Sequence, residues 1–139
     1  MLDLLNESNQ QYQRSLKASS KILKKLGQQL PSQLKYLNFS FVLINSNDLQ
    51  QFFQDTKQVK FKKFLIRTRN RDVDPILNVL RDFIQEKNDS LNYVAYEKGS
   101  IDPMDDEICY KGLEERIREI GSSVKVEKYN DLRMDTNYI

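Results

Sequence analysis

The sequence has no histidine and no tryptophan among its 139 residues, and its single cysteine is Cys109. The lack of histidine excludes Ser-His and Cys-His nucleophile pairs, zinc sites built on imidazole, and acid-base catalysis by histidine. One thiol cannot form an internal disulfide, which favours a reducing environment. We therefore expect a cytoplasmic protein, or one of another reducing intracellular compartment, with Cys109 as a buried structural thiol.

Glycine is also scarce, with four residues in the chain. No GxGxxG or GxxxxGK[ST] loop is present, so the common nucleotide-binding motifs are excluded and we expect no cofactor. Apolar runs stay far below the roughly 20 residues that a membrane span needs, and the N-terminus lacks the basic and apolar regions of a secretory signal. These absences predict a soluble chain without a membrane partner, and no small-molecule substrate is evident.

The net charge is only +2, but positive and negative residues are divided unevenly along the chain. Residues 1–71 contain 13 Lys or Arg and 4 acids, a balance of +9, whereas residues 72–139 contain 9 and 16, a balance of −7. Such asymmetry indicates an anionic partner for the first half, or contact between the two halves within or between molecules.

Residues 1–30 predict a long amphipathic helix. Its apolar positions recur at spacings of three, four or seven and fall in one arc: Leu5, Tyr12, Leu16, Leu23, Leu26 and Leu30. Gly27 and Pro31 supply the stop signal. The opposite arc is cationic and contains Arg14, Lys17, Lys21, Lys24 and Lys25. This arc would either follow a phosphate backbone or form the solvated side of a docked helix, and the apolar arc is too weak for membrane binding.

Residues 31–139 alternate between extended and helical patterns. Strands are expected at 34–44, within 57–71, at 91–97 and at 123–129. Helices are expected from about Asn47, at 74–87 and, after a cap signal at Asp102 and Pro103, up to about Ile120. Asp74 is placed to cap the second of these helices, with Pro75 at its first position. The predicted fold is therefore α/β: one small domain with about four strands in a mostly parallel or mixed sheet, alternating with helices that cover it and preceded by the amphipathic helix 1–30.

The segment KQVKFKKFLIRTRNR, residues 57–71, has seven basic residues and no acid. Its apolar centre predicts an interior strand with Lys60 and Lys62 at the entering end. At the leaving end are Arg67, Arg69 and Arg71, near Asn45, Ser46, Asn47, Glu97 and Lys98. Because ligands of parallel sheets bind at the carboxyl ends of strands, these residues suggest an anion pocket. The alternative is that Asp72 and Asp74 neutralise Arg69 and Arg71 in a solvated turn.

One acidic run offers possible metal ligands: Asp102, Asp105, Asp106 and Glu107. Each member lies in or beside the first turn of a predicted helix, where negative charge stabilises the helix dipole. We favour this capping role and expect a non-catalytic protein without a bound metal. A carboxylate-metal hydrolase is the residual enzymatic alternative.

The charge distribution leads to two hypotheses. The first is an accessory protein whose basic half binds a polyanion. The favoured polyanion is nucleic acid, bound through contacts with its phosphate backbone. The expected contacts are Arg14, Lys17, Lys21, Lys24, Lys25, Lys60, Lys62, Lys63, Arg67, Arg69 and Arg71. The second is an assembly subunit or adaptor that meets a protein partner, or another copy of itself, through the N-terminal helix and the opposite charges of the two halves.

Overall fold

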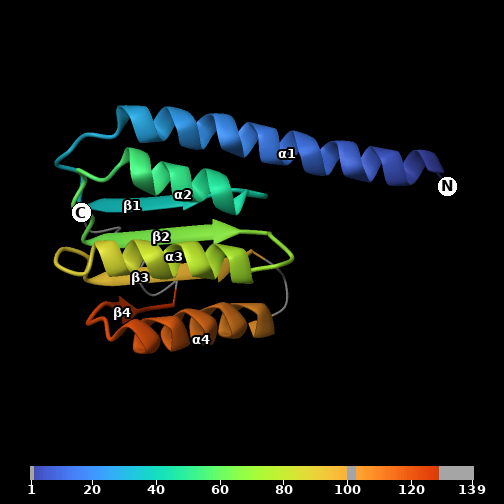
Figure 1. Cartoon of the computed structure of the whole chain (residues 1–139). Helices are drawn as coiled ribbons and strands as arrows, with labels where there is room; N and C mark the ends of the chain where they lie inside the picture. Colours follow the sequence, from blue (N-terminus) through green and yellow to red (C-terminus); the bar gives the residue numbers. More distant parts are fainter. Residues whose placement is uncertain (1, 100–102, 129–139) are drawn as a thin grey trace.

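The computed structural model describes residues 2–99 and 103–128, and within these ranges four helices alternate with four strands (Figure 1). The helices are α1 (Leu2–Gln29), α2 (Ser46–Asp55), α3 (Asp74–Glu86) and α4 (Pro103–Ile120). The strands are β1 (Tyr36–Ser40), β2 (Lys63–Thr68), β3 (Tyr93–Lys98) and β4 (Lys125–Val126). The predicted alternation and the predicted N-terminal helix are confirmed.

The four strands form one parallel sheet in the order β1-β2-β3-β4. Each strand therefore pairs with the strand that precedes it in the chain, through a helical crossover. Right-handed crossovers that always step in the same direction place every connecting helix on the same face of the sheet. Figure 1 shows α2, α3 and α4 side by side in front of the strands, with α1 beside α2 at one flank.

The buried side chains divide into two clusters, one on each face of the sheet. The larger cluster joins strand residues such as Phe64 and Ile66 to buried residues of all four helices. The smaller cluster contains Leu65 and Ala95, with Tyr93 packed against them, and no residue of a described helix. The expectation that helices cover the sheet is thus met on one face only. We call the face that carries Leu65 the second face.

Phenylalanine rings fill the centre of the helix-covered face. Phe64 is fully buried, and its ring centroid lies 5.2 Å from those of Phe53 and Phe83 and 5.3 Å from that of Phe39. Phe53 and Phe83 stack at 4.0 Å, which joins α2 to α3. Edge-to-face and stacked rings add to the stabilisation that their buried area already gives.

Helix α1 docks with its apolar arc on α2. Leu23, Ser19 and Gly27 are buried on this side, and the Ser19 hydroxyl donates to the carbonyl of Leu43 after β1. A Cβ at Gly27 would lie 3.1 Å from Cβ of Asp55, so the two helices approach closely at this point. Because α1 has 28 residues and α2 has 10, the N-terminal part of α1 extends past α2 (Figure 1).

Three details of the predicted elements are wrong. The first strand is shorter than 34–44, because β1 spans only Tyr36–Ser40. Asp74 does not cap α3; the residue before the helix is Val73, which makes no side-chain cap, and Asp72 Oδ1 accepts from the Asp74 N–H at 3.2 Å. The last strand is shorter than 123–129, because only Lys125 and Val126 are in register with β3. The predicted end of α4 is confirmed, since Gly121 follows Ile120 with a φ of 65°, a conformation that glycine adopts without strain.

Candidate functional site

The cationic arc of α1 faces away from the rest of the molecule. Its five side chains are all exposed: Arg14, Lys17, Lys21, Lys24 and Lys25. The buried positions Ser19, Leu23 and Gly27 lie on the opposite side of the helix. Within the described part of the chain, none of the five cations forms an ion pair. We call these five residues the basic helix face.

Acidic side chains do occur near this helix, but on its flank. Asp48 and Asp55 of α2 line a cavity of about 490 Å³ between α1 and α2, together with Lys24. The other four cations do not line this cavity. The positive charge of the basic helix face is therefore compensated at one margin, while most of it remains free to meet a separate anion.

Further lysines gather where the strands begin, at the amino edge of the sheet. Lys60 and Lys62 are exposed here, as predicted, and Lys62 donates its backbone N–H to the carbonyl of Lys35 at 2.7 Å. Lys87 is largely buried, and its ammonium donates to the carbonyl of Lys57. Burial lowers the pKa of Lys87; Glu86 opposes this shift, and the charges of Lys60 and Lys57 add to it.

Two of the predicted cations lie on the second face of the sheet. Lys63 places its ammonium 5.6 Å from the ring centroids of both Tyr36 and Tyr93, on the two neighbouring strands. Arg67 lies 3.7 Å from the carboxylate of Glu97 on β3. The ammonium of Lys63 therefore lies among aromatic rings, whereas the charge of Arg67 is partly offset by its neighbour Glu97.

The carboxyl edge of the sheet has a cavity of about 360 Å³ between α1 and the loops that follow β1 and β2. Arg71 lines it, with Asn45, Ser46 and Asn47 at the start of α2, as the sequence suggested. The predicted members Arg67, Arg69, Glu97 and Lys98 are not among its lining residues. The structure thus assembles only part of the predicted anion pocket.

Asn70 holds the two loops of this cavity together. Its side-chain Oδ1 accepts from the N–H of Ile44 at 3.1 Å, and its Nδ2 donates to the carbonyl of Ile44 at 2.7 Å. The amide is therefore used in forming the cavity wall, and sequence reasoning had not singled it out. The nearby carbonyl of Arg71 accepts from Lys98 Nζ at 3.4 Å.

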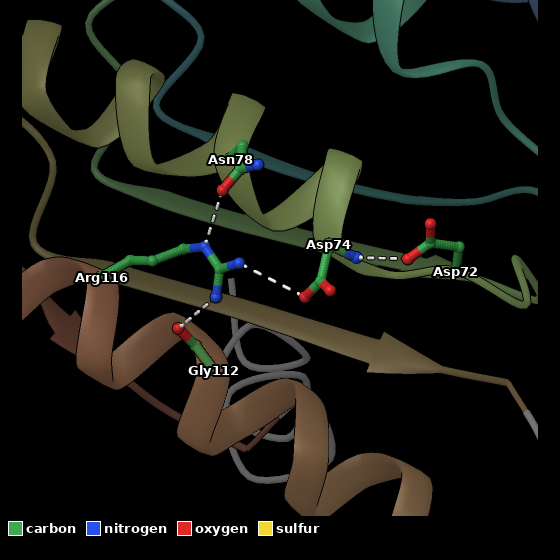
Figure 2. Close-up of polar contacts among 5 residues, drawn as sticks. All are labelled: Asp72, Asp74, Asn78, Gly112 and Arg116. Carbon is green, nitrogen blue, oxygen red and sulfur yellow. Dashed lines mark hydrogen bonds and ion pairs between the residues drawn. The ribbon is translucent and has the colours of Figure 1, made fainter.

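The acids that follow Arg69 and Arg71 bond to other groups, and in the described part of the chain no direct ion pair joins Asp72 or Asp74 to these arginines. Figure 2 shows Asp72 bonded to the backbone of Asp74, and the Asp74 carboxylate directed at Arg116 on α4. The Arg116–Asp74 distance is 3.3 Å. Arg69 and Arg71 are exposed, and neither forms an ion pair within the described residues.

The acidic run near α4 shows no assembled metal site in the described part of the chain. Asp102 and the side chains of Asp105 and Asp106 lie outside the described part of the structure, and Glu107 lies 3.9 Å from Lys128. Among the side chains that the structure describes, no three carboxylates or thiols are grouped as metal ligands. Cys109 is fully buried, as predicted, and it forms no disulfide.

The predicted cations therefore form three groups and not one patch: the basic helix face, the amino edge with Lys63, and the carboxyl edge. The ends of β2 lie at opposite edges of the sheet, as its sequence indicated. Sequence reasoning missed the aromatic partners of Lys63. The signal was a tyrosine at the start of β1 and another at the start of β3, but the register that aligns them is not visible in the sequence.

Comparison with known protein families, curated proteins and solved structures gave no match for this chain. Among the described helices, none combines the length and apolar character needed to cross a membrane.

Proposed function

We propose that this protein is a non-catalytic accessory factor that binds nucleic acid through the phosphate backbone, with the basic helix face as the principal contact. The observation that carries the proposal is the set of five exposed cations on one side of α1, which have no ion-pair partner within the described residues. Cations of this kind displace counterions from a phosphate backbone, and this release drives association without base recognition.

The rigidity of the helix supports this assignment. Ser19 fixes α1 to the segment that follows β1, and Gly27 lies against Asp55 of α2, so the cations opposite them are presented on a fixed surface. Four of the five are spaced three or four residues apart, at positions 14, 17, 21 and 24, and therefore lie along one side of the helix. A row of fixed charges loses less conformational freedom on binding than the same charges on a mobile segment.

The test is a fluorescence titration of labelled DNA and RNA at several salt concentrations between 20 and 200 mM. Replacing Lys17, Lys21 and Lys24 with glutamine should reduce the slope of log K against log salt by about 2 to 3, at up to 0.9 per phosphate contact. The matched control replaces three cations of the acidic half with glutamine: Arg81, Lys111 and Arg118. The proposal would be contradicted if both triple variants lowered the salt slope equally, or if the wild-type chain bound neither DNA nor RNA at 20 mM salt.

Assembly with a protein partner is the second candidate function. Tyr12 and Ile22 on α1 are 48% and 49% exposed, and the N-terminal part of the helix extends beyond its contact with α2. A partner that covered this part of the helix would bury both side chains. Sedimentation velocity at low and high salt distinguishes this candidate: a monomer at all concentrations, with no change in Tyr12→Ser Ile22→Ser, argues against self-assembly.

A further inference from the structure

A row of alternating aromatic and basic residues crosses the sheet at its amino end. The strand register aligns Tyr36 with Lys63, Lys63 with Tyr93, and Tyr93 with Lys125. Aligned residues of parallel strands project to the same face. Leu65, two residues after Lys63, belongs to the cluster on the second face, so the whole row lies on that face.

The row combines aromatic surface with positive charge. The ammonium of Lys63 is 5.6 Å from both tyrosine centroids, a distance at which cation–π attraction holds the rings on either side of it. Tyr36, Lys63 and Tyr93 are partly exposed, and Lys125 is exposed. The buried apolar residues of the described helices belong to the cluster on the other face. Leu65 and Ala95, further along the second face, are fully buried, so the accessible part of this face is the row at its amino end.

The charge on the second face is graded from one edge to the other. The row has two cations and no acid, and exposed Lys35 and Lys62 adjoin it at the amino edge. Toward the carboxyl edge, Arg67 is paired with Glu97. Positive charge is therefore concentrated beside the two tyrosines, which makes this end of the face complementary to an anion that also carries flat apolar groups.

From this arrangement we infer that the row at the amino end of the second face binds single-stranded nucleic acid, with unpaired bases on Tyr36 and Tyr93 and phosphates at Lys63 and Lys125. The inference rests on the proposed function and adds the form of nucleic acid and the surface that selects it. Proteins that bind single strands combine aromatic platforms, which accept any base, with cations that follow the backbone. Both parts are present here in one row.

The spacing of the row fits this occupant. Neighbouring strands lie about 4.8 Å apart, so the two tyrosines, which are two strands apart, are separated by roughly 10 Å on the sheet. Lys63 lies between them, where the phosphate linking two bases would meet its charge. A duplex keeps its bases paired and stacked and can use only the cations, so single strands should be preferred.

The experiment compares a 15-nucleotide oligo(dT) and a 15-nucleotide oligo(U) with a blunt duplex of equal length, using the full chain. Tyr36→Leu Tyr93→Leu should weaken single-strand binding by about tenfold or more, from the range known for loss of a stacked base, and leave duplex binding within twofold. Tyr36→Phe Tyr93→Phe should restore single-strand binding, because a phenyl ring stacks equally well. If the leucine variant lost binding because a tyrosine hydroxyl is needed for the structure, the phenylalanine variant would not restore binding.

The matched control is Tyr110→Leu on α4, which removes another partly exposed tyrosine with a lysine, Lys128, 6.0 Å from its ring centroid. It should leave single-strand binding unchanged. Lys125→Glu is a second test, and it changes only an exposed residue of the two-residue strand β4. It should weaken the binding of oligo(dT) at least fivefold. Photocrosslinking of a 5-iodouracil oligonucleotide, mapped by mass spectrometry, should label Tyr36 or Tyr93.

The outcomes separate this inference from the proposed function. Salt-dependent binding that is the same in the leucine, phenylalanine and wild-type chains would overturn the single-strand site and leave backbone binding by α1 in place. Loss of binding in the Lys17, Lys21 and Lys24 variant alone, with crosslinks confined to α1, would do the same. Absence of any binding at 20 mM salt would overturn both.

Discussion

The guanidinium of Arg116 lies 3.3 Å from the carboxylate of Asp74 and thereby ties α4 to the first turn of α3 (Figure 2). The same side chain donates from Nε to Asn78 at 2.9 Å and from Nη1 to the carbonyl of Gly112 at 3.0 Å. Arg116 is mostly buried, with 19% of its side chain exposed, whereas Asp74 is 73% exposed. The hydrogen bonds of the arginine should therefore matter more than its ion pair.

Replacing Arg116 with methionine should lower the free energy of unfolding by about 1 to 2 kcal/mol, because the Asn78 and Gly112 partners lose their donor. Arg116→Lys should lose nearly as much, since an ammonium cannot reproduce the three directions of the guanidinium. Urea denaturation measures both. The control is Arg81→Met, because among the described residues the Arg81 side chain is bonded to the adjacent exposed Asp82 alone; a loss there equal to that of Arg116→Met would contradict this ranking.

The contact between α1 and α2 should be sensitive to size at Gly27. Gly27→Leu should cost about 1 to 3 kcal/mol, because its side chain would have to displace Asp55 or separate the helices. Gly27→Ala should be near neutral, since its gain of about 1 kcal/mol in helix propensity is offset by the 3.1 Å approach to Asp55 Cβ. Thermal and urea unfolding of the two variants check the order. A stabilised Gly27→Leu would show that the helices are not in close contact.

Tyr96 should make the fold sensitive to alkali. Burial raises the pKa of its hydroxyl well above the ordinary value, and the hydrogen bond with Thr68 at 2.9 Å only partly opposes this shift. Above pH 10 the unfolded chain releases this proton and the folded chain keeps it, so stability falls as pH rises past 10. Tyr96→Phe should reduce that slope and cost about 1 kcal/mol at neutral pH.

Absorbance at 295 nm during a pH titration provides the measurement for Tyr96. The wild-type chain should show one tyrosine that ionises only when the circular dichroism signal of folding is lost, and Tyr96→Phe should lack it. Tyr12→Phe, which changes an exposed ring, is the control and should retain the late ionisation. Complete titration of all tyrosines in the folded chain would contradict the burial of Tyr96.

Phe64 should be among the most costly positions to truncate. Phe64→Ala should lower the free energy of unfolding by about 3 to 5 kcal/mol, because the cavity would lie among the rings of Phe39, Phe53 and Phe83. Phe64→Leu is the milder variant if the alanine chain does not fold. Phe41→Leu, at a partly buried ring on the margin of the same cluster, should cost less than Phe64→Leu in urea denaturation.

Local periodicity was sufficient to predict the elements and the orientation of α1. The positions of Leu23 and Lys21 on opposite sides of that helix follow from 100° per residue and need no tertiary information. The parallel sheet likewise followed from strands alternating with helices. The predicted capping role of Asp74 was wrong because its carboxylate bonds to Arg116, which is 42 residues away in the chain. Only the packing of α3 on α4 brings these two residues together.

The two faces of the sheet could not be separated from the sequence. Phe64, Leu65 and Ile66 form one apolar run, which is typical of a strand covered on both faces, although the helices lie only on the side of Phe64 and Ile66. The strand order decides this, and strand order depends on pairings between distant segments. The same information was needed to bring Tyr36 and Tyr93 to either side of Lys63.

The sequential order of the strands also has a consequence for how the chain reaches its native state. Each strand pairs with the strand that precedes it in the chain, and α2, α3 and α4 each pack beside the preceding helix. Each new strand can therefore join the sheet as soon as it is synthesised, without waiting for a later segment of the chain. Pairing between neighbours keeps the average loop to be closed short, which favours rapid folding. On the ribosome, the sheet can grow one strand at a time behind the emerging chain, with the two residues of β4 added last.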